Sequence, residues 1–329
     1  MPFPGALNMK KNLKLFRNLK LFITVSLFVL LWTVIPAIGG ETAVIAPLAT
    51  HSLLLDAQRV GNTLIAVGER GHILISKDNG NNWDQAQVPT RATLTGIFFI
   101  DPLNGWVVGH DQVILRTSDG GKNWELVYEN PEAQSPLLDI IFLDNKHGYA
   151  IGAYGQFLES FDGGSSWEGR WISEDDFHLN QIIALGDQLF IAAEAGFIYR
   201  SDDEGQNWTL LEPGYQGSFF GIYAAEEGRL LLFGLRGHLF LSDDAGATWT
   251  AVETGTEASL TSGLRLNDGT LVITGLAGAL LTSKDNGSSF VLHQDPDRKG
   301  FSKILQATDD SIIAVGNFGV AKFSQQSIH

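Results

Sequence analysis

The 329-residue chain contains no cysteine. It therefore cannot form a disulfide, bind a metal through thiolates, use a thiol as a nucleophile or carry a lipid on a cysteine, and its fold must be held by its core alone. Basic residues are also scarce, because 22 lysines and arginines stand against 37 acidic residues. A surface of this charge repels nucleic acid and anionic lipid, so we expect neither as a partner.

Helical periodicity and catalytic motifs are missing as well. Beyond the first forty residues, no window of eleven or more residues keeps a helical period, which indicates an all-β fold. The chain has no serine-triad motif, phosphate loop or zinc motif, and its eight histidines include no H-x-x-x-H pair. We therefore expect no catalytic residues, no metal site and no cofactor.

The one long hydrophobic run lies near the N-terminus. A stretch with five basic residues, Lys10 to Lys20, precedes the apolar run "LFITVSLFVLLWTVI" at 21–35, and small residues follow at Ala37 and Gly39. This order predicts a cleaved secretory signal peptide over residues 1–39 and a periplasmic or otherwise exported protein. The alternative is an uncleaved anchor in the inner membrane, although a span needs about 20 apolar residues. Removal of residues 1–39 leaves a net charge of −20, because it takes away five basic residues and no acidic one.

A short box recurs along the rest of the chain. The segment "RTSDGGKNWEL" at 116–126 has five relatives, and all six fit [S/T]-x-D-x-G-x-x-[W/F] with spacings of 41, 43, 41, 41 and 41 residues. The box aspartates are Asp78, Asp119, Asp162, Asp203, Asp244 and Asp285, and the aromatics are Trp83, Trp124, Trp167, Trp208, Trp249 and Phe290. Repetition favours a structural role, since a catalytic site needs one asymmetric arrangement of residues. Calcium binding is the weaker reading, because no box spreads ligands over twelve residues and ends in a bidentate glutamate.

The physical chemistry of the box suits a tight turn. Its Asp and Ser or Thr oxygens can accept backbone N–H groups of their own turn. Its glycine suits a positive φ, and its aromatic can be buried between sheets. We expect the box to join the third strand of each repeat to the fourth.

A second element keeps the same period and has seven copies. The tetrapeptides begin at residues 68, 109, 152, 193, 234, 275 and 316, and most read G-x-x-G. Short apolar pieces between the landmarks supply four strands per repeat, which predicts a single seven-bladed β-propeller over residues 40–329. The last repeat has no box, so we expect "TAVIAPLA" at 42–49 to pair as the outer strand of the last blade and close the ring.

The box, the glycine element and the count of seven together resemble the Asp-box repeats of the photosystem II stability/assembly factor family. The D-x-x-x-G-[W/Y]-x-x-G elements at Asp101–Gly109 and Asp144–Gly152 are the more specific part of this resemblance. It implies a non-catalytic propeller that binds proteins during assembly of a membrane complex. Photosynthetic members share a clustered arginine patch, whereas ten arginines remain here in a chain of net charge −20. This departure favours a non-photosynthetic bacterial relative whose partner is a subunit of an envelope complex or transporter.

The binding residues should lie opposite the boxes. The turn between strands two and three and the link to the next blade share one face of a propeller, and loop residues that vary between repeats are where binding is usually carried. The candidates are Arg70, His110, Asp111, Tyr154, Glu194, Arg236 and Phe318 in the turns, and Arg91, Arg298 and Phe301 in the links. We expect a monomer that uses this face.

A carbohydrate-active enzyme is the alternative function. Glycoside hydrolases need two suitably spaced carboxylates, and Asp111, Asp175, Asp176 and Glu194 are available in loops. A sialidase would need an F-R-I-P segment, which the chain lacks.

Overall fold

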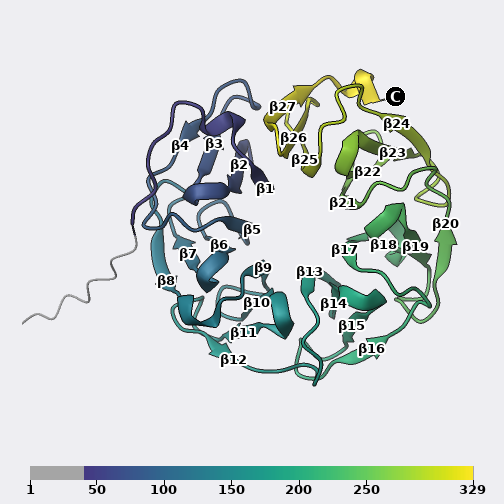
Figure 1. The fold of residues 1–329 in the computed structure, drawn as a ribbon, viewed down its shortest axis with the longest axis horizontal. Helices are drawn as coiled ribbons and strands as arrows, with labels where there is room; N and C mark the ends of the chain where they lie inside the picture. Colours follow the sequence, from purple (N-terminus) through teal and green to yellow (C-terminus); the bar gives the residue numbers. More distant parts are fainter. Residues whose placement is uncertain (1–40, 329) are drawn as a thin grey trace, which may run out of the picture. The chain divides into compact units, whose positions relative to one another are not determined.

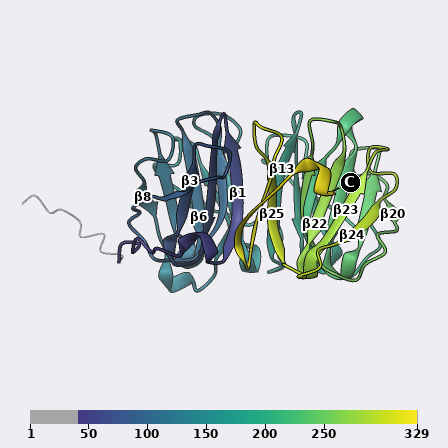
Figure 2. The same cartoon turned by 90° about the horizontal axis from the view of Figure 1, so that it is seen from above.

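In each repeat, short runs rich in β-branched and aromatic residues end at Gly, Asp or Asn, and each run forms one strand. The computed structural model describes residues 41–328, and in the unit Gly40–His329 the strands form seven small sheets arranged as a ring (Figure 1). The innermost strand of each sheet contacts those of its two neighbours, and β25 (Phe301–Gln306) contacts β1 (Leu54–Val60), so the ring is closed. Seen from the side, the strands cross the thickness of the disc (Figure 2). The predicted signal peptide lies outside the described residues.

The blades follow one another along the chain, each running from the centre outward. Blade one is β1, β2 (Thr63–Gly68), β3 (Ile73–Ser76) and β4 (Asp84–Gln85). Blade two is β5 (Leu94–Phe99), β6 (Gly105–Gly109), β7 (Ile114–Thr117) and β8 (Glu125–Tyr128), and blade three is β9 (Leu137–Phe142), β10 (Gly148–Gly152), β11 (Phe157–Ser160) and β12 (Glu168–Gly169). Blade four is β13 (Leu179–Leu185), β14 (Gln188–Ala193), β15 (Ile198–Ser201) and β16 (Thr209–Leu211). Blade five is β17 (Phe219–Ala224), β18 (Leu230–Gly234), β19 (Leu239–Ser242) and β20 (Thr250–Val252). Blade six is β21 (Leu260–Arg265), β22 (Leu271–Gly275), β23 (Ala279–Ser283) and β24 (Val291–Gln294), and blade seven is β25, β26 (Ile312–Gly316) and β27 (Gly319–Phe323).

Short 3-10 turns form where the chain reverses at the G-x-x-G elements. Six of them join the second strand of a blade to the third: η2 (Glu69–Gly71), η3 (His110–Gln112), η5 (Ala153–Gly155), η6 (Glu194–Gly196), η8 (Leu235–Gly237) and η9 (Leu276–Gly278). The others are η1 (Ala49–His51), η4 (Pro131–Ala133), η7 (Glu226–Gly228) and η10 (Gln325–Ile328).

The core is divided among the interfaces between blades. Each second strand is buried over nearly its whole length, because both faces of the sheet are covered by neighbouring blades. The box aromatic of each blade packs against the preceding blade. Trp124 of blade two joins a cluster with Ile65 and Val67 of blade one, and Trp83 of blade one joins a cluster with Leu305 and Ile313 of blade seven.

Hydrogen bonds within the box explain its residue types. The Thr117 hydroxyl donates to Asp119 Oδ1 at 3.0 Å and accepts the Gly121 N–H at 3.0 Å. Asp119 Oδ1 also accepts the Asn123 N–H at 3.0 Å. The Trp124 indole N–H donates to the Gly121 carbonyl at 3.0 Å, which fastens the ring to its own turn. The hydroxyl, aspartate and glycine bonds recur in the other boxes, for example at Ser242 and Asp244. The indole bond recurs at Trp83, Trp167 and Trp249.

The seven-bladed fold is confirmed, but the predicted closure of the ring is wrong. Blade seven has three strands in the described residues, and residues 42–49 form no strand. They lie along blade one, where the Ala43 N–H donates to the Val88 carbonyl at 2.9 Å and Gln85 bonds the backbone of Val44 and Ala46. Ala43 is buried in the cluster between blades one and two, which fixes the segment on that side. Pro47, which has no N–H to donate to a sheet, then begins the turn into η1.

We expect replacement of Trp124 by alanine to destabilise the protein by about 3–5 kcal/mol, because it leaves a cavity between blades one and two. Trp124 is 7% exposed. Urea denaturation would measure the loss, with Trp171→Ala as the matched control. Trp171 is 68% exposed and should change the free energy of unfolding by about 0.5 kcal/mol or less. Equal losses in the two variants would contradict the structural role of the box aromatic.

Candidate protein-binding face

The G-x-x-G turns and the links between blades lie on one face of the disc, which we call the link face. Backbone hydrogen bonds join the two kinds of loop: Gly71 N–H to the Ala92 carbonyl at 2.9 Å, His110 N–H to Thr93 at 2.8 Å, and Glu194 N–H to His178 at 2.9 Å. The boxes lie on the opposite face, the box face. There they bond the turns between first and second strands, as Gly120 N–H does to the Leu103 carbonyl at 3.0 Å.

The second variable residue of these turns adopts the left-handed conformation. The φ values are 58° at Arg70, 57° at Asp111, 55° at Tyr154 and 57° at Arg236. Non-glycine residues seldom adopt this conformation, because Cβ crowds the backbone. Here the hydrogen bonds of the links hold the turn in place, and all four side chains are exposed.

The residues named from the sequence do not all reach the surface. Those exposed on the link face are Arg70, Arg91, His110, Asp111, Tyr154, Arg236 and Arg298. Glu194 and Phe318 are half-buried. Phe301 is 3% exposed as the first residue of β25, where its ring packs against those of Phe318 and Phe323. The Phe301 side chain therefore does not reach the surface of the link face, because the link ends one residue earlier than expected.

Blades three and four carry an aromatic patch, which we define as Tyr154, Trp171, Phe177, His178 and Phe197. The Tyr154 and His178 rings meet edge to face at 4.9 Å, and Phe177 meets Phe197 at 5.0 Å. Trp171 lies over Gly155, so close that a Cβ there would be 3.3 Å from its ring. Tyr154 and Trp171 are 53% and 68% exposed. Large exposed aromatics close together are typical of protein-binding surfaces.

Sequence reasoning named Tyr154 but missed Trp171. A signal was present, because Trp171 and Trp106 are the two tryptophans after residue 40 that lie outside the boxes. Trp106 is buried and stacks on Phe142 at 3.6 Å, whereas Trp171 belongs to the long link after β12. A tryptophan in a link between blades is the pattern that would have found it.

The loop carboxylates around the patch have structural partners. Glu194 Oε2 accepts the His178 N–H at 3.2 Å and lies 3.7 Å from His178 Nδ1. The Asp175 N–H donates to the Ser173 hydroxyl at 3.1 Å, and that hydroxyl donates to Asp175 Oδ2 at 3.4 Å. Glu194 and Asp175 therefore serve to hold the link between blades three and four.

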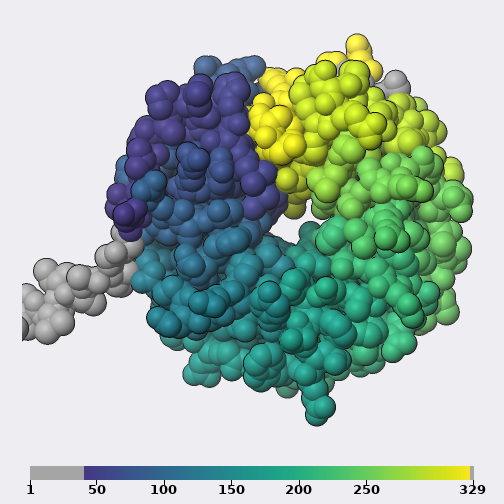
Figure 3. Space-filling model, viewed as in Figure 1, coloured from purple at the N-terminus to yellow at the C-terminus, as the bar shows by residue number. Residues whose placement is uncertain are grey.

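A polar channel runs through the centre of the ring, where Figure 3 shows the hollow. Each innermost strand has a bulge near its start, which skips one residue in the pairing with the second strand. A bulge re-aims side chains, and here all seven skipped residues line a cavity of about 110 Å³ together with Asp56, Asp139, Gln181 and Lys303, each of which follows a skipped residue. From blade one to blade seven, the residue that follows the skipped one is Asp56, Gly96, Asp139, Gln181, Gly221, Ser262 and Lys303.

Channel side chains tie neighbouring blades together. Asp56 Oδ2 accepts the Ile97 N–H at 3.0 Å, Asp139 Oδ2 accepts the Ile182 N–H at 2.9 Å, and Gln181 Oε1 accepts the Ile222 N–H at 2.8 Å. Lys303 Nζ of blade seven lies 3.0 Å from Asp56 Oδ1 of blade one. This ion pair therefore spans the seam between the last blade and the first.

Asp139 is the perturbed carboxyl of the channel. Burial, followed by the nearby Asp56 carboxylate, raises the pKa of Asp139 to about 7, and its bonds to backbone N–H groups and the Lys303 charge oppose this only in part. For Lys303, burial acts to lower the pKa, but the Asp56 carboxylate outweighs it and the pKa is raised. The channel thus holds one carboxylate paired with lysine and a second carboxyl that is near its titration point at neutral pH.

Residues 41–328 contain neither a cluster of metal ligands nor a helix suited to span a membrane. No group of three or more His, Asp or Glu side chains there is arranged to hold a metal ion. Within the same residues, no helix has the length and apolar character needed to cross a membrane.

Comparison with known proteins identifies the family. Residues 75–130 and 127–273, more than half of the chain, match the family described as photosynthesis system II assembly factor YCF48. The chain belongs to this family.

Curated YCF48-type relatives match over shorter stretches. The photosystem II assembly lipoprotein Ycf48 of Picosynechococcus sp. is 37% identical over 159 residues, which are 47% of this chain and 47% of the relative. The photosystem II assembly lipoprotein Ycf48 of Synechococcus sp. is 29% identical over 39% of this chain and 27% of its own length. An uncharacterized protein of Bacillus subtilis, YkuO, is 32% identical over 23% of the chain. The chain therefore spans less than half of the length of these relatives.

Solved structures agree with the YCF48-type fold. A structure described as YCF48 bound to D1 peptide superposes with a TM-score of 0.69 at 20% identity, over 87% of this chain and 95% of that one. YCF48 from Cyanidioschyzon merolae gives a TM-score of 0.68 at 18% identity, over 86% and 99%. A streptogramin B lyase gives 0.71 at 14% identity, over 83% and 93%. Because a lyase shares the ring, the fold alone does not decide between binding and catalysis.

We expect Asp139→Asn to remove the loss of stability that this YCF48-family chain undergoes as the pH rises from about 4 to about 7. A carboxyl whose folded pKa is raised to about 7 favours the folded state at low pH, and this stability is lost as the pH rises through about 7. The variant should therefore unfold at a higher temperature than wild type above about pH 7, with the difference vanishing below about pH 4.

Asp119→Asn is the matched control, because it should change the pH dependence of stability at acidic pH and leave the pH dependence near pH 7 unchanged. Hydrogen bonds from Asn123 lower the pKa of the Asp119 carboxyl to about 2 in the wild-type protein. The stability that this carboxylate contributes is therefore present above its ordinary pKa and is lost as the pH falls toward about 2. Thermal unfolding from about pH 3 to 9 would distinguish the two variants. An unchanged slope between pH 5 and 9 in Asp139→Asn would contradict the assignment.

Proposed function

We propose that this protein is a non-catalytic propeller that binds a protein partner and assists the assembly or stability of a membrane protein complex. Membership of the YCF48 family carries the proposal. A similar structure has been solved with a D1 peptide bound, and two relatives are called photosystem II assembly lipoproteins. The partner is a subunit of a membrane complex, and the protein acts as a monomer.

The link face is the binding surface in this proposal, and the aromatic patch of blades three and four is its principal contact region. Tyr154 and Trp171 offer the large exposed rings that dominate interface energies. Their surroundings are acidic, with Glu174, Asp175 and Asp176 in the same link. Apolar rings bordered by carboxylates suit an extended partner segment that carries apolar and basic side chains.

The exposed arginines of the link face do not gather in one place. Arg70 and Arg91 belong to blade one and the link after it, Arg236 belongs to blade five, and Arg298 lies in the link after blade six. Arg91 is also paired with Glu41 at 2.6 Å. This arrangement supports a client whose contacts are made by aromatic burial more than by pairing with an arginine cluster.

We propose that the protein acts outside the cytoplasm. The basic, apolar and small-residue order of residues 1–39 supports a signal peptide, and an inner-membrane anchor is the alternative. Two relatives are named lipoproteins, but this chain has no cysteine to carry such a lipid.

The test is affinity purification from detergent-solubilised membranes of the source cells, with quantitative mass spectrometry of the proteins that copurify. The double variant Tyr154→Ser, Trp171→Ser should lower recovery of the membrane-complex subunits at least about tenfold, because burial of two aromatic rings is lost. Its thermal unfolding midpoint should change little, since both side chains are exposed.

Leu103→Ser, Phe161→Ser is the matched control. Leu103 and Phe161 are 55% and 63% exposed and lie in turns of the box face. If the two double variants lose recovery of the membrane-complex subunits equally, the assignment of the link face as the binding surface is wrong. Deletion of the gene should in addition reduce the accumulated amount of the same membrane complex, and an unchanged amount would count against an assembly role.

A further inference from the structure

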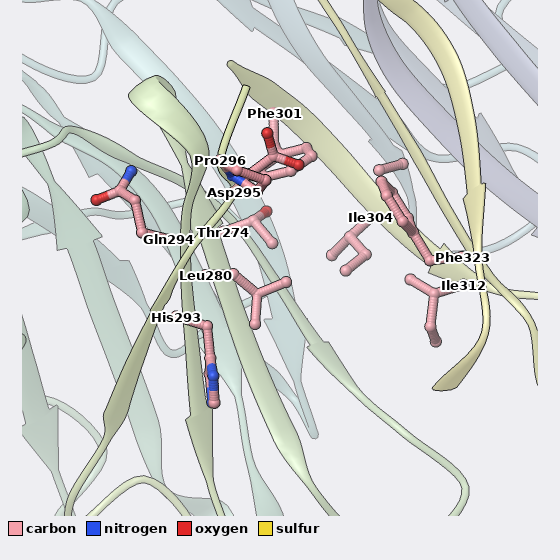
Figure 4. A pocket seen from close by; sticks show the side chains of 11 residues that line it. Thr274, Leu280, His293, Gln294, Asp295, Pro296, Phe301, Ile304, Ile312 and Phe323 are labelled. Atoms are coloured by element: carbon pink, nitrogen blue, oxygen red, sulfur yellow. The ribbon is translucent and has the colours of Figure 1, made fainter. Parts of the chain in front are cut away.

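The interface between blades six and seven contains an apolar niche that no side chain of residues 41–328 fills. It has a volume of about 330 Å³ and is lined by strands of both blades, with Leu280 and Thr274 on one side and Ile304, Ile312 and Phe323 on the other. Figure 4 shows these side chains facing one another across the gap. The buried cluster here has four apolar residues, against seven to fourteen in the other clusters.

The six sister interfaces show what occupies this position elsewhere. Between blades five and six, Phe290 packs in a cluster with Leu231 and Leu239 of blade five and Ile273 of blade six. Trp249 occupies the interface between blades four and five in the same way, and Trp208 that between blades three and four. In each case the aromatic comes from the residue just before the outermost strand of the following blade. Within residues 41–328, blade seven has no such strand, and none of these residues supplies the corresponding ring to its niche.

The outer edge of blade seven also has no strand partner among residues 41–328. In the other blades, the third strand pairs on its outer side with a fourth, as β23 pairs antiparallel with β24. β27 pairs with β26 alone among the described strands. Phe323 pairs with Ile312 as Ser283 pairs with Leu271, so a phenylalanine stands where the other blades place the box hydroxyl. Its ring narrows the niche but leaves the cavity open.

An unpaired edge beside an apolar niche is a site for strand addition. Edge strands present free backbone donors and acceptors, and partner peptides bind such edges with side chains set into adjacent pockets. An apolar cavity of about 150 Å³ can hold a benzene ring, so about 330 Å³ is room for an indole. The six filled interfaces define both requirements at once: an extended strand and one aromatic residue preceding it.

We propose that this niche and the β27 edge bind an extended peptide segment of a partner protein, which pairs antiparallel with β27 and inserts one aromatic side chain between blades six and seven. The partner completes the seventh blade as box residues complete the others. This site lies between blades six and seven, away from the aromatic patch of blades three and four, and it does not depend on the proposed function of the link face.

The probe is a peptide of this protein's own sequence. Residues 247–254, "ATWTAVET", hold the aromatic and outer strand of blade five. A fluorescein-labelled copy should bind the intact protein saturably in fluorescence anisotropy. The same peptide with alanine in place of Trp249 should bind at least about tenfold more weakly, because burial of the indole is lost. Equal binding of both peptides would overturn the proposal. Absence of saturable binding at protein concentrations up to about 0.5 mM would overturn it as well, because the Kd would then be of millimolar order or weaker.

Two variants of the protein locate the binding. Leu280→Glu places a carboxylate in the niche at a half-buried position and should weaken binding of the tryptophan peptide at least about tenfold. Val291→Glu is its control, because Val291 is 61% exposed on β24 and should leave binding unchanged. Binding that is the same in both variants would place the peptide elsewhere and contradict the site.

A third variant distinguishes a blocked niche from an unfolded protein. Ala314→Phe adds a ring inside the niche from β26, and it should block the peptide without lowering the thermal unfolding midpoint. Sedimentation at rising protein concentration tests a second copy of this chain as the occupant. Dimerisation that Leu280→Glu abolishes would make a second copy the occupant and so overturn the assignment to a partner protein.

Discussion

The ring depends on a close approach between the box glycine and a large side chain on the second strand of the preceding blade, which is tightest at Gly80, Gly164, Gly205 and Gly287. A Cβ placed on Gly80 would lie 2.5 Å from Ile313, one on Gly164 would lie 2.5 Å from the Trp106 indole, and one on Gly205 would lie 2.6 Å from the Tyr149 hydroxyl. These glycines also have φ between 79° and 89°. Two independent constraints, backbone conformation and space, therefore require glycine at this position. Because the glycine lets the turn touch the neighbouring sheet, the aromatic three residues later can enter the interface beside it.

The sequence was sufficient to predict the features that repeat. Six boxes and seven glycine elements at a nearly constant period predicted the number of blades, the position of the turns and the two faces, because each repeat reports the same local physics. It was insufficient where a choice depended on distant contacts. Residues 42–49 are apolar and β-forming, but strand propensity does not say which edge they join. Burial of Ala43 between blades one and two decides that, together with the bonds to Gln85 and Val88.

The candidate site could be predicted only in outline, for a related reason. Comparing loops between repeats found Tyr154 and the exposed arginines, because the repeat fixes where a loop begins. It failed for Phe301, where a one-residue error in the end of a link separates an exposed residue from a buried one. It also overlooked the channel, although Asp56, Asp139 and Lys303 occupy one equivalent position of three repeats. Only the bulge, which depends on pairing with the second strand, turns that position toward the axis.

The interfaces beside blade seven differ because each box faces backward, toward the preceding blade. The seam between blades seven and one therefore receives the box of blade one, and Trp83 and Gly80 fill it from that side. The Lys303–Asp56 pair at 3.0 Å and the Thr308–Asn79 hydrogen bond at 2.7 Å hold the same seam from the channel and from the box face. Closure thus needs no strand shared between the two ends. The interface that lacks a box aromatic among the described residues lies one step earlier, between blades six and seven. A chain of near-equal repeats can therefore close its ring and still keep one interface distinct from the other six.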